Sequence, residues 1–175
     1  MNKRIYLVLE VKKRELDSRC YFAIKACLND YEVVICKKNN FYKNKRFLKS
    51  GMVILKSAGK NYLKEIVEIK SIGHSLSVMD EEGLMYFSPE DFIQRRVYKE
   101  NLKYIDYIFT WGQDDYQLLS NHLTEHKNKI YKTGSSRIDI LKDPLNQIYY
   151  DDALEIKKKF GKFFLLNTFF NFANN

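Results

Sequence analysis

Short apolar, β-prone runs alternate with helical segments along the chain, and this alternation limits the possible folds more than any other feature. Continuous apolar runs are typical of strands that are buried on both faces, as in parallel sheets. We predict seven strands, at residues 4–11, 32–36, 52–57, 75–80, 107–112, within 130–136 and at 162–170. Strands that alternate with helices in this way predict a parallel, doubly wound α/β sheet.

The predicted helices lie between these strands. The clearest one falls within 13–31, where apolar side chains form a stripe at positions 16, 20, 23, 24, 27 and 28. Further helical patterns lie within 59–74, 88–105, 113–129 and 146–160, whereas 39–51 is predicted as a polar helix or loop. Ser88 and Pro89 supply a cap and a first-turn proline ahead of two acidic residues, so a helix should begin there.

The composition indicates a globular domain with a core of its own. The 175 residues are 45% apolar and 15% aromatic, and no apolar run approaches the roughly 18 residues of a membrane span. Charge is uneven, because residues 1–60 hold 15 of the 30 Lys and Arg but only 5 of the 22 Asp and Glu. This basic half could face phosphates, nucleic acid or an anionic membrane, or it is a solvated lysine-rich surface. Since no nucleic-acid-binding motif accompanies it, no nucleic-acid partner is expected.

Several common chemistries have no counterpart in the sequence. Cys20, Cys27 and Cys36 fit neither a redox pair nor a zinc ribbon, and we expect them to be small buried hydrophobes in a reducing compartment. His122 and His126 lie four residues apart on a polar helix end without the context of a metal site, so no metal is predicted. The chain contains no Walker A loop, no dinucleotide-binding glycine motif and no nucleophile elbow.

Three adjacent carboxylates, Asp80, Glu81 and Glu82, stand at the end of the predicted strand 75–80. Adjacent like charges repel one another and gain nothing for folding. Ligands of open α/β sheets bind beyond the carboxyl ends of the strands, so the triplet is placed where it could face a polar cleft. There a carboxylate could act as a general base or bind sugar hydroxyls. The alternative is an exposed turn in which one of the three caps the following segment.

Other predicted strands also end in polar segments, which should lie at the same edge of the sheet. These segments are EVKKREL, KSAGKN, TWGQDD, TGSSRID and NTFFNFANN. Several of them place Gly, Ser, Thr, Lys or Arg where backbone N–H groups and helix N-termini could hold an anion. Trp111 ends one of these strands and is predicted to be core or a cleft wall.

Several motifs occur in order from about residue 8 to residue 174, and they are LEVKKRELDSR, KS, GH followed by DEEGL, FTWG, TGSSRIDIL and NTFFNFAN. This ordered set resembles a known family, the bacterial surface carbohydrate biosynthesis proteins of lipopolysaccharide and capsule loci. These proteins are glycosyltransferase-B-like and are more distantly similar to CDP-glycerol glycerophosphotransferases and UDP-N-acetylglucosamine 2-epimerases. The family's TGNPRFD appears here as TGSSRID, so Gly134, Arg137 and Asp139 match, while Ser135 and Ser136 replace an Asn-Pro pair and make the loop less rigid.

The resemblance implies the N-terminal half of a glycosyltransferase-B-like, two-domain fold. Residues 1–143 would form a Rossmann-like, acceptor-side domain, and 144–175 would form a linker helix and the first strand of a truncated second domain. In such folds the nucleotide-sugar donor sits mainly on the second half. The resemblance therefore implies that this chain is a fragment, inactive on its own, that supplies one wall of the cleft.

The implied activity is metal-independent transfer of a sugar from a nucleotide-sugar donor, with the donor as substrate and no cofactor. The implied partners are the nucleotide sugar and a glycan or lipid-linked acceptor. The protein would be cytoplasmic, and its basic first sixty residues predict weak peripheral docking to an anionic inner membrane. Two alternatives stay open: a non-catalytic module that binds a nucleotide sugar or glycan, and an epimerase-like nucleotide-sugar enzyme.

The resemblance also points to catalytic candidates within the acidic triplet. Glu81 or Glu82 would accept the proton of the acceptor hydroxyl or bind hydroxyl groups, with Asp80 beside them. Basic and N–H groups at helix starts would hold the diphosphate leaving group.

The candidate substrate-binding residues come from the same motifs. Arg14 is one anion contact, although it could instead pair with Asp17 or Glu10. Arg137 is another, although together with Asp139 it could simply fix a turn. The remaining candidates for substrate binding or for lining the cleft are Lys56, Ser57, Trp111, Gly112, Gly134, Asn167, Asn171 and Asn174.

Overall fold

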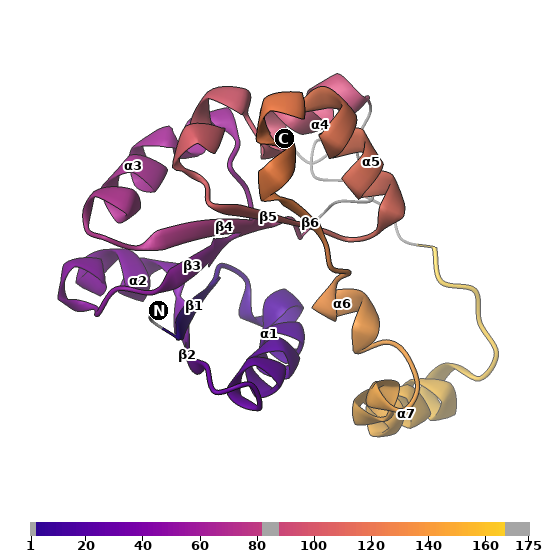
Figure 1. The fold of residues 1–175 in the computed structure, drawn as a ribbon. Helices are drawn as coiled ribbons and strands as arrows, with labels where there is room; N and C mark the ends of the chain where they lie inside the picture. Colours follow the sequence, from indigo (N-terminus) through magenta and orange to yellow (C-terminus); the bar gives the residue numbers. More distant parts are fainter. Residues whose placement is uncertain (1–2, 82–87, 167–175) are drawn as a thin grey trace, which may run out of the picture. The chain divides into compact units, whose positions relative to one another are not determined.

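The structure is a computed structural model that describes residues 3–81 and 88–166. It divides the chain into two units, Met1–Ile140 and Leu141–Asn175. The first unit contains a six-stranded sheet in which every strand pair is parallel (Figure 1). Its strands are β1 (Arg4–Leu9), β2 (Glu32–Lys37), β3 (Met52–Leu55), β4 (Ser75–Met79), β5 (Tyr107–Thr110) and β6 (Ile130–Lys132). The predicted α/β fold with a parallel, Rossmann-like sheet is confirmed.

The strand order is β2-β1-β3-β4-β5-β6. The chain therefore moves outward from β1 to β2, returns to the other side of β1 at β3, and then continues in one direction to β6. Ile5 shows this reversal, because it is in register with Val33 of β2 on one side and with Met52 of β3 on the other. In open α/β sheets the point where the order reverses opens a crevice at the carboxyl ends of the strands. Here that point lies between β1 and β3.

Helices cover both faces of the sheet, but unequally. They are α1 (Lys12–Cys27), α2 (Lys38–Asn44), α3 (Leu63–Ser71), α4 (Pro89–Arg96), α5 (Gln113–His122) and α6 (Ser136–Asp139), joined by the 3₁₀ turns η1 (Lys45–Phe47), η2 (Lys60–Tyr62), η3 (Lys99–Tyr104) and η4 (Thr124–Lys129). Helices α1 and α6 pack against each other on one side of the sheet (Figure 1). No helix in the described part of the chain is both long and apolar enough to cross a membrane.

The larger core lies between the sheet and helices α2 to α5. It contains Phe41 of α2, Ile66 of α3, Phe92 of α4 and Leu119 of α5, all of which are 5% exposed or less. The core on the opposite face is smaller and joins sheet residues such as Leu7 to α1. On that face the rings of β5 and β6 also contact one another, and the rings of Tyr107 and Phe109 are stacked with their centroids 6.2 Å apart.

Helix α1 buries a different face from the one predicted. The sequence predicted a stripe through Ile24 and Leu28, yet these side chains are 59% and 75% exposed. The structure instead buries Glu15, Ser18 and Arg19. Hydrophobic periodicity does not reveal this face, because the first two turns of α1 carry polar side chains there. These side chains meet charged partners at the edge of the sheet. The three cysteines are free, and Cys27 of this helix is exposed, so the expectation that all three are buried is wrong.

Helix α4 begins where the sequence predicted. The hydroxyl oxygen of Ser88 accepts a hydrogen bond from the backbone N–H of Asp91 at 3.2 Å, and Pro89 occupies the first turn. This cap satisfies one of the N–H groups that a helix start leaves without a partner. The predicted segment 88–105 is nonetheless interrupted, because α4 ends at Arg96 and the turn η3 follows.

The second unit is described here by itself. It contains the turn η5 (Leu145–Tyr149) and helix α7 (Tyr150–Phe160), which together cover the predicted helix 146–160. The predicted strand 162–170 is not present at residues 162–166, and its remainder lies outside the described residues. Within the described part of the chain, residues 162–166 pair with no strand that could satisfy their backbone N–H and C=O groups. Apolar composition alone does not create a strand without such a partner.

Candidate functional site

Charged side chains from four strand ends gather at the carboxyl edge of the sheet. Glu10 follows β1, Lys56 follows β3, Glu81 follows β4 and Arg137 lies in the short helix after β6. The sequence predicted this edge as the site because parallel strands deliver their carboxyl ends to one side. Two separate clusters of ion pairs form there.

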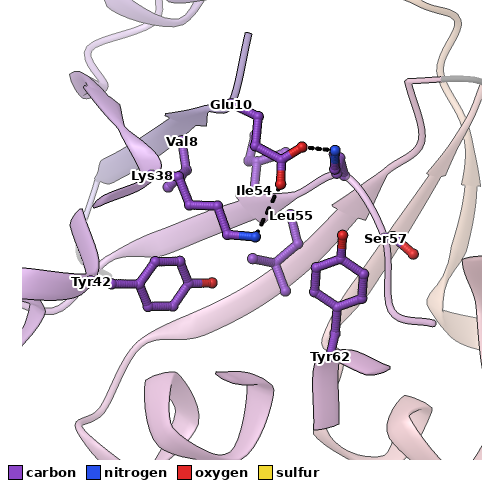
Figure 2. Close-up of a pocket in the computed structure, with 9 residues that line it drawn as sticks. Val8, Glu10, Lys38, Tyr42, Ile54, Leu55, Ser57 and Tyr62 are labelled. Carbon is purple, nitrogen blue, oxygen red and sulfur yellow. Dashed lines mark hydrogen bonds and ion pairs between the residues drawn. The ribbon is translucent and has the colours of Figure 1, made fainter. Parts of the chain in front are cut away.

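The first cluster is the Glu10 clamp, formed by Glu10, Lys38 and Lys56 (Figure 2). The Glu10 carboxylate pairs with Lys38 at 3.0 Å and also accepts a hydrogen bond from Lys56. Water reaches all three side chains, which are 28%, 29% and 21% exposed respectively. The Lys38 ammonium lies 5.9 Å from the ring centroid of Tyr42 and 5.3 Å from that of Tyr62. The clamp is thus partly hydrated and stands beside two aromatic rings.

The start of α1 is occupied by a carboxylate of the same helix. Glu15 accepts hydrogen bonds from the backbone N–H groups of Glu10 at 2.8 Å and Val11 at 3.3 Å, and it pairs with Arg14 at 3.0 Å. In many α/β folds the helix start after the first strand holds a ligand phosphate. Here Glu15 already accepts hydrogen bonds at that position, so these two N–H groups are not open to a ligand phosphate. Arg14 therefore has an ion-pair partner, Glu15, that the sequence prediction did not include.

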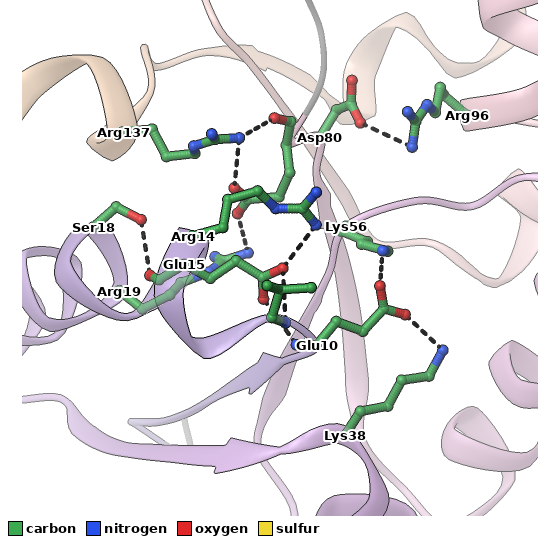
Figure 3. A network of polar contacts seen from close by, with 12 residues as sticks. Glu10, Arg14, Glu15, Ser18, Arg19, Lys38, Lys56, Asp80, Arg96 and Arg137 are labelled. Carbon is green, nitrogen blue, oxygen red and sulfur yellow. Dashed lines mark hydrogen bonds and ion pairs between the residues drawn. The ribbon is translucent and has the colours of Figure 1, made fainter. Parts of the chain in front are cut away.

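The second cluster is centred on Glu81, which is nearly inaccessible to water, and its partners Arg19 and Arg137 are labelled in Figure 3. Glu81 is 4% exposed and its carboxylate lies 2.5 Å from Arg19 and 3.6 Å from Arg137. Arg19 is 1% exposed, and its Nε and Nη1 have no hydrogen-bond partner among the described residues. Burial raises the pKa of Glu81, and the attraction of the two arginines offsets only part of that rise. We call Arg19 and Glu81 the buried cluster; Arg137, at its edge, has a side chain that is 30% exposed.

Asp80, the neighbour of Glu81, is also buried. Its carboxylate lies 3.7 Å from Arg96, and its backbone oxygen accepts a hydrogen bond of 2.6 Å from the indole Nε1 of Trp111. The two carboxylates that follow β4 are therefore partners of buried or half-buried arginines. The exposed-turn interpretation of the acidic triplet is wrong for Asp80 and Glu81, while Glu82 lies outside the described residues.

Ser57 shapes the turn after β3. Its hydroxyl lies 3.3 Å from the backbone oxygen of Arg95 and 3.2 Å from that of Arg96, and it accepts a hydrogen bond from the N–H of Gly59 at 3.0 Å. A Cβ on Gly59 would lie 1.9 Å from the backbone oxygen of Arg95, so only glycine fits this close approach. Lys56, one residue earlier, is thereby held on a fixed backbone.

The turn after β6 aims Arg137 at Glu81. Gly134 has a φ of +97° there, and its N–H donates to the backbone oxygen of Thr110 at 3.0 Å. Arg137 then donates a hydrogen bond to the backbone oxygen of Glu81. Asp139 lies two residues further along the chain, and its N–H donates to the backbone oxygen of Ser135 at 3.0 Å. The TGSSRID segment therefore fixes a turn and also delivers an arginine to the site.

Every candidate residue in the described part of the chain follows the carboxyl end of a strand, but only some of them join the network of charged side chains. Arg14, Lys56, Glu81 and Arg137 lie in the polar network of Figure 3. Gly112 stands at the start of α5, where its oxygen accepts a hydrogen bond from the N–H of Tyr116 at 3.1 Å. Predicted residues outside the described part of the chain are Glu82, Asn167, Asn171 and Asn174.

Comparisons with protein-family models, curated proteins and solved structures find no match for this chain. Function is therefore inferred from the resemblance of the motifs and from the geometry of the site. Within residues 3–81 and 88–166, no group of three or more His, Cys, Asp or Glu could hold a metal ion. The described part of this edge offers a ligand cationic side chains that are held on a fixed backbone.

Sequence reasoning missed Glu15, Arg19 and Lys38. Arg19 and Glu15 lie four residues apart on α1 and could have been noticed as opposite charges on one face of a helix whose strand ends at the site. Lys38 could have been noticed because it directly follows β2. All three were obscured by the uniformly basic composition of the first sixty residues.

Proposed function

We propose that the chain is part of a glycosyltransferase-like protein of surface polysaccharide biosynthesis and forms one wall of its nucleotide-sugar cleft. The observation that carries this proposal is the meeting of Arg137 with Glu81, at 3.6 Å. These residues belong to two separate motifs of the resembled family, and their contact brings both motifs to one edge of a parallel sheet. The ordered motifs and the ligand rule for such sheets support the same conclusion.

The proposed reaction is transfer of a sugar to a glycan or lipid-linked acceptor. The acceptor hydroxyl oxygen forms a bond to the anomeric carbon, the bond from that carbon to the diphosphate breaks, and the hydroxyl proton passes to a carboxylate. Arg14 and Arg137, whose side chains are 35% and 30% exposed, would stabilise the departing diphosphate. Because Glu81 is only 4% exposed, its proposed role is to position Arg137, and the proton acceptor is proposed to be Glu82.

A binding function without catalysis is the second candidate. One observation favours it: Asp80 and Glu81 are both buried and lie next to arginines, so neither offers an open carboxylate to an acceptor hydroxyl. In that case the edge would recognise a nucleotide sugar or glycan without turnover.

The test uses the protein as its gene encodes it, supplied with a panel of nucleotide sugars and a glycan acceptor. Release of nucleoside diphosphate is measured for the unaltered protein and for Arg137→Ala. We expect Arg137→Ala to lower kcat/KM by about 10²-fold or more, because it removes a donor to the leaving group. Arg95→Ala is the matched control, since the Arg95 side chain pairs with Asp91 of the same helix and is 69% exposed. Binding of a nucleotide sugar without any release would favour the second candidate, and neither binding nor release would overturn both.

A further inference from the structure

A small pocket lies directly under the Glu10 clamp (Figure 2). Its apolar floor is formed by Val8, Ile54 and Leu55, and its walls carry the rings of Tyr42 and Tyr62. Because Val8 belongs to β1 and Leu55 to β3, the pocket opens where the strand order of the sheet reverses. That is the place where ligands of open α/β sheets bind.

The clamp places two ammonium groups against the Glu10 carboxylate. Lys38 and Lys56 both contact Glu10, and Lys38 also forms a longer ion pair of 3.9 Å with Glu65. Glu65 also accepts a hydrogen bond from the Tyr42 hydroxyl at 3.0 Å. The oxygens of Glu10 therefore occupy the position that an external anion would take between the two lysines.

Glu10 can leave this position at small cost. Its side chain is 28% exposed, and hydrated ion pairs contribute little to stability. The pocket has a volume of about 30 Å³. That volume holds roughly one or two water molecules. An anion larger than water therefore enters only when Glu10 turns outward, and a dianion then gains more from the two lysines than Glu10 loses.

We propose that this pocket binds the phosphate group of a sugar phosphate, and that Glu10 competes with that phosphate for Lys38 and Lys56. Lysine is a common phosphate ligand, and Tyr62 with the apolar floor supplies a surface for the C–H groups of a sugar ring. This proposal rests on the proposed function for its ligand class. The proposal adds a second anion subsite on the α2 and α3 side of the sheet. It also makes Glu10 the residue that regulates access to this subsite.

The test is isothermal titration calorimetry of the 175-residue chain with glucose 1-phosphate, inorganic phosphate and glucuronate as probes. If the clamp is closed about nine-tenths of the time, Glu10→Gln should bind glucose 1-phosphate about tenfold more tightly than the unaltered chain, because removal of a competing state multiplies the apparent affinity. Lys38→Ala should weaken binding by about tenfold or more. Lys64→Ala, which removes an exposed lysine of α3 that does not line the pocket, should leave the affinity unchanged. Circular dichroism confirms that each variant is folded.

Each outcome decides the proposal. No tightening in folded Glu10→Gln, or full affinity in folded Lys38→Ala, overturns it. Equal affinity for inorganic phosphate overturns the contribution of the sugar, and equal affinity for glucuronate overturns the choice of phosphate. If the protein releases nucleoside diphosphate from a nucleotide sugar but the chain does not bind glucose 1-phosphate, this inference alone is overturned. If the chain binds glucose 1-phosphate but no nucleotide sugar is turned over, the pocket is supported while the proposed function fails.

Discussion

The Glu10 clamp and the buried cluster lie at the same edge of the same sheet, and they differ chiefly in how much water reaches them. The three side chains of the clamp are 21–29% exposed, whereas Arg19 and Glu81 have side chains only 2% and 5% exposed. A hydrated ion pair contributes little to stability and can be exchanged for a ligand. A dry pair cannot lose one member without leaving an uncompensated charge. We therefore expect the clamp to exchange Glu10 for a ligand, whereas the buried cluster acts as a fixed scaffold.

The largest expected effect comes from breaking the buried cluster. Glu81→Leu should lower the free energy of unfolding by about 3–5 kcal/mol, because Arg19 stays charged and buried without its partner. Urea denaturation followed by circular dichroism measures the loss. Glu125→Leu is the control, since Glu125 is 73% exposed and pairs with Lys99 at 3.7 Å. Adding Arg19→Met to Glu81→Leu should restore most of the stability. A loss below about 1 kcal/mol in Glu81→Leu would contradict the assignment of a fixed scaffold.

The pH dependence of stability should show a smaller effect of the same cluster. Burial raises the pKa of Glu81 above its ordinary value, so between the unfolded and folded pKa values the native chain binds more protons than the unfolded chain. The contribution of Glu81 to stability is therefore largest below about pH 4.3, the ordinary glutamate pKa, and declines as the pH rises through the folded pKa. Urea midpoints measured from pH 4 to 8 test this. As the pH rises, the urea midpoint of the unaltered chain should fall relative to that of the Arg19→Met, Glu81→Leu double variant. A constant or opposite trend in this difference would contradict the expected direction of the pH dependence.

The smallest expected effect is that of Glu10→Gln on stability. It should change the free energy of unfolding by no more than about 1 kcal/mol, because the clamp is partly hydrated. The same urea experiment in low and high salt measures it, and salt should reduce the difference by screening the lysines. A loss above about 2 kcal/mol would show that the clamp is as fixed as the buried cluster and would remove the contrast between them.

Part of the fold and site could be predicted from local sequence alone. The helix start at Ser88 and Pro89 follows from residue chemistry within a few positions, and the structure has it there. Periodicity failed at α1, because burial of Glu15 and Arg19 depends on partners far along the chain. Arg19 meets Glu81, which stands more than sixty positions later, and no local pattern contains that information.

By itself the sequence determined that strands and helices alternate and that polar segments end the strands, because those properties depend on neighbouring residues and on their period. From these follow a parallel sheet and a charged carboxyl edge. Only the tertiary structure decided the order of the strands, and with it which charges meet. It also decided that the Arg19–Glu81 pair is buried and that the Lys38–Glu10 pair is hydrated, because hydration depends on everything packed around a group. The charges of Glu10 and Glu81 are alike in the sequence, and packing alone makes the first exchangeable and the second fixed.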